Sequence, residues 1–464
     1  MEIKNNTFNF NIYTKVYLPW VLLFFSLNTT PDNLFYLYNL SSPVNFYSII
    51  NFFRALFPII IFIILLTLFF KKKFKFDIIC KLLFIYIFFQ FIGFLFFPLN
   101  IFQNIYWIIS SLSVVLLTNN LLSYKKDYSA NIIKIYLLLM MLVVIFFLYK
   151  IYSNYFSLDS FIGNSTSTYS SKILMFGANF FNQPTIRSTG LSRQLLLIYL
   201  FICIVILYSK NNKYYPFYYF LAFIFCFSIW SLQSRTVLYF LFIFFLIFFT
   251  SFFNISFFKK IKFALVVFIL PAFLYFSEPI IKNKLLLVHQ TQTQTQTQTQ
   301  TQTQTQPQTQ TQTQTRGKFN ENFQDYNRWI YEKSSSGRLS MWKESIKYII
   351  KSPIYGYGPL ADRIIIKENI SNIYFYSLLC GGVIGFAMIV LVNVIVLYNN
   401  FKLLFFYKIF NSPNLILLKI SAIYIFFFIF RSLVEVSYGV YSLDFFIFLL
   451  SCVSVSRYLK STKI

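Results

Sequence analysis

The arginine side chains of this sequence could form an anion-binding site. The 464-residue chain has 40 Lys and Arg against 14 Asp and Glu, and ten of the 40 are arginines. A guanidinium group is planar, stays charged and presents five N–H donors, so it can bind the oxygens of a phosphate or diphosphate in pairs. Lysine carries the same charge without this paired geometry. Arginines that lie apart from the lysines would therefore indicate a phosphorylated substrate.

Motifs for nucleotide and metal chemistry are missing from the sequence. It has no GxxxxGK[ST] phosphate loop, no Asp-x-Asp motif, no HExxH and a single histidine, His289. Its five cysteines show no CxxC or Cys/His spacing, which argues against a zinc site and against a disulfide framework. These absences argue against ATP or a sugar nucleotide as the substrate, and we expect no cofactor.

The composition predicts an all-α, polytopic transmembrane bundle of about twelve helices. Apolar residues make up 57% of the chain and charged residues 12%, which is too little polar surface for a soluble protein of this size. A helix needs about 20 apolar residues to cross the hydrocarbon core. The candidate spans are residues 13–28, 48–70, 78–97, 101–122, 132–152, 191–208, 214–232, 236–255, 262–280, 373–398, 415–437 and 439–456.

The net charge of +26 follows the loops between these spans, which favours a topology signal over a nucleic-acid-binding face. Lysines cluster in alternate short loops, and the positive-inside rule assigns those loops to the cytoplasm. They are Lys71, Lys72, Lys73, Lys75, Lys125, Lys126, Lys210, Lys213, Lys259, Lys260, Lys262, Lys402 and Lys408. We therefore expect a multi-pass inner-membrane protein with both termini in the cytoplasm.

This topology divides the chain into three regions. Residues 1–280 hold helices one to nine with an outer loop at 153–190, residues 281–372 form a large periplasmic loop, and residues 373–464 hold helices ten to twelve. By the same topology, nine of the ten arginines lie in outer loops or the outer halves of spans, whereas twenty of the thirty lysines are cytoplasmic. Arginine is therefore concentrated on the outer side.

The large loop has two distinct parts. Residues 290–315 repeat Thr-Gln, and such a tract has no apolar face that could offset the entropy of ordering, so we expect a disordered tether. Residues 337–351 predict an amphipathic helix that lies on the membrane surface or caps the bundle. Gly356 and Gly358 then give a turn where backbone can approach a ligand closely. The predicted apolar face of the helix is Met341, Trp342, Ile346, Ile349 and Ile350.

Arg54 and Arg431 lie within predicted spans, and Arg235 lies at the edge of the span 236–255. A cation there costs about 2.5 to 3.5 kcal/mol at mid-membrane, so each is expected to face the bundle interior or a water-filled cavity. Snorkelling, or an ion pair of Arg431 with Glu435 at i, i+4, is the alternative. Taken together, the outer arginines suggest a lipid-linked phosphate or diphosphate as the ligand.

Several short motifs along the chain resemble the bacterial O-antigen polymerase and O-antigen ligase family of membrane glycosyltransferases. The resemblance covers residues 185–440. It rests on Arg187-Ser-Thr-Gly190, Ser234-Arg235, Ser336-Gly337-Arg338 with Trp342, Pro353-Ile-Tyr-Gly356-Tyr-Gly358, Ser371-Asn372-Ile-Tyr374, Gly382-Val-Ile-Gly385, and Arg431 with Glu435.

The resemblance implies a metal-independent transfer of glycan from an undecaprenyl diphosphate carrier at the periplasmic face. Ligases of this family usually carry a His-Asn pair where this chain has Ser371-Asn372, which favours a repeat-unit polymerase of surface polysaccharide. The alternatives are an O-antigen ligase that transfers glycan to lipid A core, a flippase or transporter of the same lipid-linked oligosaccharide, and a non-catalytic assembly scaffold. A transporter often shows two related halves, and no such symmetry is visible here.

On this basis we assign candidate roles. Arg187, Arg235, Arg338, Arg431 and Glu435 are the catalytic candidates, in which the arginines bind diphosphate and stabilise the leaving group. Gly190, Trp342, Gly356, Gly358, Asn372, Tyr374 and Arg54 are the substrate-binding candidates. Glu435, Asp362 and Glu368 stay open as the general base. The expected partners are membrane lipid, the lipid-linked oligosaccharide, a chain-length regulator and a flippase, and no nucleic acid.

Overall fold

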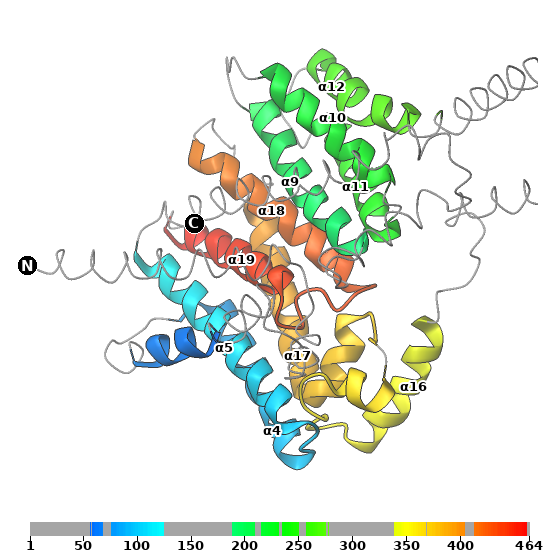
Figure 1. Cartoon of the computed structure of the whole chain (residues 1–464). Coiled ribbons are helices and arrows are strands. Elements are labelled where there is room, and N and C mark those ends of the chain that lie inside the picture. Colours follow the sequence, from blue (N-terminus) through cyan, green and yellow to red (C-terminus); the bar gives the residue numbers. More distant parts are fainter. Residues whose placement is uncertain are drawn as a thin grey trace, which may run out of the picture. The chain divides into compact units, whose positions relative to one another are not determined.

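A computed structural model of the chain describes residues 58–67, 76–124, 188–208, 215–231, 234–249, 257–274, 338–367, 369–403 and 413–461, together with Leu56 and Ser277. Within these ranges every regular element is a helix, so the all-α prediction is confirmed there. The chain forms two compact units (Figure 1). Unit 1 comprises Met1–Met141 and Ser334–Ile464, and unit 2 comprises Leu142–Lys333.

Several predicted segments lie outside the described residues. They are the spans 13–28 and 132–152, the outer loop 153–190 up to residue 187, and the Thr-Gln tract 290–315. The total of twelve spans and the division of the chain into three regions therefore stay predictions.

Unit 1 is a helical bundle assembled from both ends of the sequence. Its elements are α4 (Ile78–Phe96), α5 (Ile101–Tyr124), α16 (Arg338–Lys351), the π-helix η4 (Asp362–Ile366), α17 (Ile373–Phe401), α18 (Pro413–Ser432) and α19 (Leu443–Ser461). Helix α17 packs extensively along α4, α18 packs against α19, and α5 contacts both α4 and α19. The predicted amphipathic helix 337–351 corresponds to α16, which packs on α17.

Unit 2 contains a second group of apolar helices. They are α9 (Ser188–Tyr208), α10 (Tyr215–Ser231), α11 (Arg235–Phe249) and α12 (Phe257–Ala264), which continues into the π-helix η2 (Leu265–Ile269). The buried Tyr199 hydroxyl of α9 donates a hydrogen bond of 3.3 Å to the carbonyl of Val267. Phe245 of α11 stacks on Phe268 with ring centroids 4.2 Å apart. These contacts hold the π-helix against its neighbours.

Three of the described helices are long and apolar enough to cross a membrane: Ile78–Phe96, Ile101–Asn119 and Ile373–Phe401. Four shorter apolar helical segments accompany them, at Pro58–Thr67, Ser192–Leu207, Tyr215–Trp230 and Thr236–Phe245. The apolar helices support the predicted membrane character of the chain.

Two predicted boundaries need correction. The spans 415–437 and 439–456 were expected to be nearly continuous, but α18 ends at Ser432 and α19 begins at Leu443. The segment between them turns at Ser437, whose φ of 31° is left-handed, and the N–H of Gly439 donates to the carbonyl of Val436 at 2.8 Å. An ordinary helix cannot continue through a left-handed residue.

The second correction concerns the lysines at 259, 260 and 262, which the sequence analysis placed in or beside a cytoplasmic loop. All three lie within α12. Lys260 is buried, and the Nζ of Lys259 donates to the carbonyl of Leu207 at the end of α9 at 3.5 Å. The helix begins at Phe257, earlier than the predicted span at 262. Lysines are compatible with this earlier start because their long side chains can lie along a helix surface.

Helix α17 is broken at Gly382, which has φ 62° and ψ −166°. The loop from Pro353 to Gly358 pairs with the break: the N–H of Tyr357 donates to the carbonyl of Leu379 at 2.9 Å, and the N–H of Val383 donates to the carbonyl of Pro353 at 2.8 Å. A helix break leaves backbone groups without helical partners, and inside a membrane these must be satisfied by other protein groups. The loop supplies them.

A polar cluster connects three helices at the opposite end of the unit 1 bundle. The carboxylate of Asp77 caps α4, accepts from the Oγ of Ser456 at 3.0 Å and pairs with the Nζ of Lys460 at 2.7 Å. The side chain of Asn119 accepts from the Asp77 N–H at 3.0 Å, while Arg457 donates to the Asn119 carbonyl at 2.9 Å. The beginning of α4, the end of α5 and the end of α19 are thereby fixed together.

We expect Gly382→Ala to destabilise unit 1. The backbone of Gly382 lies in a region that only glycine adopts readily, and an added Cβ would overlap the carbonyl oxygen of Ile354. The conformational strain alone is about 1 to 3 kcal/mol. The thermal midpoint of monodisperse protein in detergent, followed by size-exclusion chromatography, measures the loss.

Gly381→Ala is the matched control, because a Cβ at Gly381 meets its nearest neighbour, the side chain of Gln90, at an ordinary contact distance of 3.7 Å. The two variants differ by one position and add the same methyl group. Equal midpoints for both would contradict the role given to the break.

Candidate functional site

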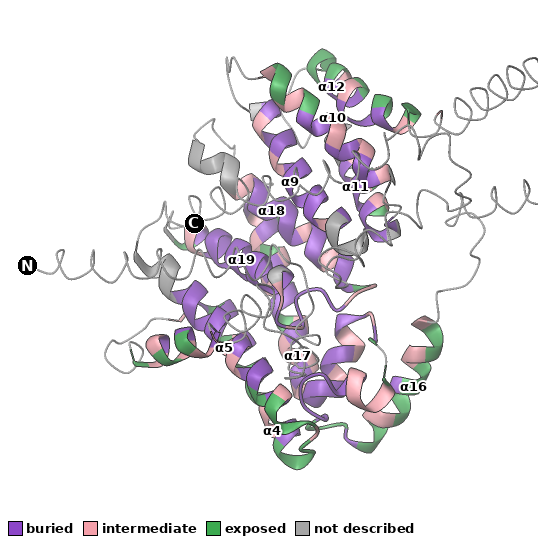
Figure 2. Cartoon of the chain, in the orientation of Figure 1, coloured by how far each residue is buried: buried purple, intermediate pink, exposed green. Residues whose placement is uncertain are grey.

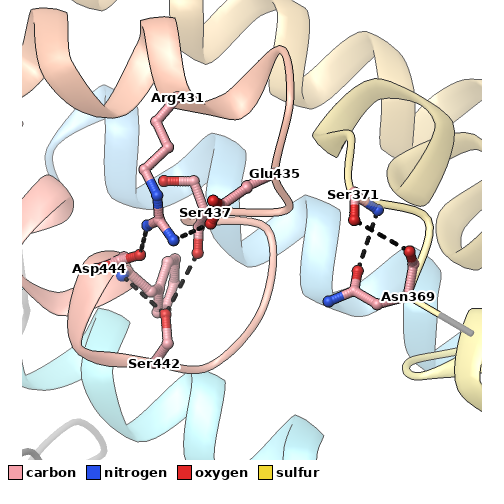
Figure 3. A network of polar contacts seen from close by, with 8 residues as sticks. Asn369, Ser371, Arg431, Glu435, Ser437, Ser442 and Asp444 are labelled. Carbon is pink, nitrogen blue, oxygen red and sulfur yellow. Dashed lines mark hydrogen bonds and ion pairs between the residues drawn. The ribbon is translucent and has the colours of Figure 1, made fainter. Parts of the chain in front are cut away.

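A buried ion-pair cluster lies where α18 ends. Arg431, in the last turn of α18, forms ion pairs with Glu435 in the following turn and with Asp444 in the first turn of α19 (Figure 3). The side chain of Asp444 is 2% exposed, while that of Glu435 is 24% exposed. Two carboxylates share one guanidinium, so the cluster has a formal net charge of −1. Glu435 is the member that water or a ligand can reach.

The sequence analysis considered an ion pair with Glu435 as the alternative to ligand binding by Arg431. The structure shows this ion pair, since the Arg431 guanidinium is bound to carboxylates of the protein. The pair with Glu435 had been considered from its i, i+4 spacing, but Glu435 lies just beyond the helix end. Its N–H still donates to the Arg431 carbonyl at 2.9 Å, so the helical spacing persists for one residue into the turn.

Aromatic side chains of the turn after α18 and of the neighbouring helices hold this turn in place. Tyr438 stacks on Phe448 of α19 with centroids 3.8 Å apart, and its hydroxyl donates to the Oδ1 of Asn393 in α17. The Tyr86 hydroxyl of α4 donates to the carbonyl of Gly439 at 3.1 Å. Helices α4, α17 and α19 thus fix the turn that carries Glu435.

Asn372 links this turn to the start of α17. Its Oδ1 accepts from the N–H groups of Tyr374 at 2.8 Å and Phe375 at 3.2 Å, which caps the helix. Its Nδ2 donates to the carbonyl of Leu433 at 2.8 Å. Asn372 therefore joins the ends of two helices. The Tyr374 hydroxyl accepts from the Nδ2 of Asn393 at 3.0 Å, so it belongs to the same network.

Ser371 precedes this cap in a strained conformation. Its φ is 53°, its N–H donates to the Oδ1 of Asn369 at 3.1 Å, and its hydroxyl donates to the carbonyl of Asn369 at 3.1 Å (Figure 3). A non-glycine residue at positive φ is uncommon, and the Asn369 contacts stabilise it here. The side chain at position 371 thus sits one residue before the link to the turn of Glu435.

Helix α16 brings Arg338 and Trp342 to the same end of unit 1. Arg338 is half-buried and begins the helix. One turn later, the indole of Trp342 donates to the carbonyl of Ile370 at 2.8 Å and stacks on Phe375 with centroids 5.5 Å apart. Trp342 therefore has a structural contact that fixes α16 to the beginning of α17.

Arg363, which had no assigned role, also lies at this end. Its guanidinium is 5.9 Å from the ring centroid of Trp107 in α5, and Trp107 meets Tyr441 edge to face at 5.9 Å. Tyr441 belongs to the turn between α18 and α19. The described part of unit 1 thus brings three arginines, Arg338, Arg363 and Arg431, to one end of the bundle.

The glycines at 356 and 358 approach the backbone of the protein itself. A Cβ on Gly356 would lie 2.6 Å from the carbonyl carbon of Cys380, and a Cβ on Gly358 would lie 2.9 Å from the Cβ of Phe94. The two glycines therefore allow a close approach of backbone, as expected, but what they approach is α17 and α4. Between the two glycines, burial and then the neighbouring Tyr348 raise the pKa of Tyr357, so its hydroxyl stays a neutral donor, 3.2 Å from the Tyr348 carbonyl.

The structure leaves the other predicted site residues without a described contact. Arg54 and Arg187 lie outside the described residues. Arg235 is the first residue of α11 and Gly190 lies in the first turn of α9, but only their backbone is described. Both belong to unit 2, and their role in the site stays a prediction.

Asp444 is the residue that the sequence analysis missed. It lies thirteen positions after Arg431, across a turn whose shape the sequence pattern did not predict. The available signal was a carboxylate in an otherwise apolar segment, because an acidic residue buried among apolar ones needs a cationic partner.

In its described residues the chain is thus an all-helical protein with membrane-length apolar helices, and three arginines lie at one end of the unit 1 bundle. Residues 218–390 match the model of a family described as O-antigen ligase. This match confirms the resemblance to the O-antigen polymerase and ligase family, and the matched segment contains Arg235, Arg338, Trp342, Asn372 and Tyr374. No curated protein and no solved structure matches the chain.

We expect Asp444→Asn to cost more stability than Glu435→Gln. Both variants remove one charge from the cluster, but Asp444 is buried and Glu435 is partly exposed. Breaking a buried ion pair costs about 3 to 5 kcal/mol, whereas a pair open to solvent contributes about 0 to 1 kcal/mol. The thermal midpoints of the two purified variants give the comparison. Equal midpoints would argue that water reaches both carboxylates alike.

Proposed function

We propose that this protein is a repeat-unit polymerase of surface polysaccharide. It transfers the growing glycan from a polyprenyl diphosphate, in bacteria undecaprenyl diphosphate, to a hydroxyl group of an incoming lipid-linked repeat unit. The observation that carries the proposal is the O-antigen ligase match across residues 218–390, which includes two of the arginines assigned to diphosphate binding.

The reaction exchanges one glycosidic bond for another. The bond between the donor sugar C1 and the diphosphate oxygen breaks, and a bond between C1 and the acceptor oxygen forms. The acceptor hydroxyl loses its proton to a base, and polyprenyl diphosphate leaves as an anion. No external energy source is required, because the cleaved bond is to a diphosphate.

The residues divide into two roles in this proposal. Arg187, Arg235 and Arg338 bind the diphosphate and stabilise charge on the leaving group, which is electrostatic catalysis. Glu435 takes the proton from the hydroxyl group of the incoming repeat unit, because its carboxylate is the more exposed one of the cluster. Arg431 orients Glu435 through their ion pair, and Asp444 balances Arg431 on its buried side. The proposal includes neither metal nor cofactor.

The residue at position 371 favours polymerase over ligase. A ligase of the resembled family carries histidine there, whereas this chain has serine, whose hydroxyl is bound to the Asn369 carbonyl. Serine cannot take the place of an imidazole as a base at neutral pH. The ligase remains the second candidate, because the matching family model is itself described as O-antigen ligase.

The proposed setting is the inner membrane, with the loop 281–372 in the periplasm and both termini in the cytoplasm. That orientation puts the polar end of unit 1 at the outer surface, where lipid-linked repeat units are presented. A flippase that delivers these units and a regulator of chain length are the partners this reaction would need.

A deletion strain of the source organism tests the function. We expect loss of polymer, with single repeat units still attached to the cell-surface acceptor, because ligation continues without polymerisation. Electrophoresis of the surface glycan and mass analysis of carrier lipids measure both species. Loss of all attached glycan, with polymer retained on the carrier lipid, would identify a ligase and overturn the proposal.

We expect Arg235→Lys and Arg338→Lys to lower the transfer rate about ten- to a hundredfold at normal protein abundance. Lysine keeps the charge but loses the paired donors, and a hydrogen bond to a charged group contributes about 1.5 to 3 kcal/mol. Transfer between purified lipid-linked repeat units, with protein in nanodiscs, gives the rates. Arg457→Lys, at the opposite end of unit 1, is the control and should retain activity; full activity in all three variants would show that positive charge alone suffices.

A further inference from the structure

Helix α16 exposes a second apolar face that differs from the predicted one. Trp342 and Ile349 pack against the core formed with α17, but Leu339, Ile346 and Ile350 are exposed, and Ile350 is 71% exposed. These three residues fall within about 40° of one another around the helix axis. The predicted apolar face is thus divided between a side that packs on the core and a side that is exposed among the described residues of unit 1.

The exposed face continues onto other parts of unit 1. After Ile350 come the exposed side chains of Ile354 and Tyr355, and Tyr355 stacks on Phe96 at the end of α4 with centroids 4.7 Å apart. The neighbouring Leu95 is exposed as well. Figure 2 shows exposed residues along α16 and at this end of α4. We call this surface the α16 patch: Leu339, Ile346, Ile350, Ile354, Tyr355, Leu95 and Phe96.

The α16 patch joins the exposed stripe of a membrane-length helix. On α4 the exposed residues Ile78, Ile85, Phe88 and Leu95 recur at helical spacing along one side. From Ile78 to Phe96 the helix rises about 27 Å, close to the thickness of about 30 Å of a hydrocarbon core. When α4 spans the membrane, Phe96 and the Tyr355 ring on it therefore lie near one lipid headgroup layer.

Lysines border the apolar edge of α16. Lys343, Lys347 and Lys351 are all exposed and follow Leu339 and Ile350 around the helix on one side. The ammonium of Lys351 also lies 5.5 Å above the Tyr348 ring. Apolar residues beside a row of lysines are typical of helices that lie in the membrane interface, where lysine heads meet lipid phosphates and apolar side chains enter the acyl layer.

We propose that the α16 patch is seated in the lipid headgroup layer and that its lysines bind acidic phospholipid. The bilayer is the occupant because the patch is continuous with the lipid-facing stripe of α4 and carries positive charge at its border. Helix α16 is then an in-plane anchor that holds Arg338 and Trp342 at the membrane surface. The inference is independent of the proposed reaction, since it uses only the exposed surface of unit 1.

Spin labels on single added cysteines of the full-length protein in nanodiscs test the proposal. The labels are placed at Ile350→Cys in the patch and at Glu344→Cys, which is exposed elsewhere on the same helix. Phe88→Cys on α4 gives the reference for a lipid-facing site. All five native cysteines are buried and free, and the parent protein without added cysteine controls for their labelling. Collision rates with oxygen, which enters lipid, and with a water-soluble nickel chelate are then measured.

We expect the label at position 350 to resemble that at position 88, with frequent oxygen collisions and few chelate collisions, and the label at position 344 to show the reverse. Equal chelate access at 350 and 344 would mean that the patch faces water. Exclusion of both agents at position 350 would mean that protein covers the patch, such as a second copy of the chain. Either result overturns the proposal.

The role of the lysines has its own measurement. In nanodiscs with spin-labelled phosphatidylglycerol or phosphatidylcholine, the parent protein should retain more of the acidic lipid next to its surface. Replacing Lys343, Lys347 and Lys351 by glutamine should remove most of this preference, while the collision pattern at position 350 persists. An unchanged preference would refute binding of acidic lipid by these lysines.

Discussion

The backbone hydrogen bonds at the break in α17 are the interaction on which unit 1 depends. A membrane-length helix that is interrupted nine residues after its start leaves amide and carbonyl groups that lipid cannot satisfy. The loop from Pro353 to Gly358 provides their partners, and it fits only because glycine occupies the positions where two backbones meet. Because this loop directly follows α16, its pairing with the break fixes where α16 packs along α17.

Once the loop is fixed, the polar end of the bundle follows from it. Trp342 contacts the segment just before α17, Asn372 joins that segment to the end of α18, and the turn beyond α18 carries Glu435. The guanidinium charge of Arg431 is neutralised within the protein, because it has two carboxylate partners. A ligand diphosphate would therefore depend on arginines outside the ion-pair cluster.

The sequence predicted the helical class, the positions of most described helices and the resemblance to the O-antigen ligase family model, because apolar runs of membrane length and short motifs are local signals. It also predicted the start of α17 at residue 373, where Asn372 provides a strong helix cap. It did not predict the break at Gly382, since a glycine inside an apolar run carries no indication of the loop that pairs with it. The partner of Arg431 on α19 and the two-sided packing of α16 were likewise set by tertiary contacts between distant segments.

The cluster around Asp77 has a consequence for biosynthesis. The carboxylate that begins α4 binds Ser456 and Lys460, which follow it by 379 and 383 residues. Helices α4 and α5 therefore enter the membrane long before the chain segment that completes their end of the bundle has been translated, and loop closure over such a separation is entropically costly. Unit 1 therefore closes as a late event, after unit 2 has been synthesised, and a chain truncated before Ser456 would keep α4 and α5 but lack this closure.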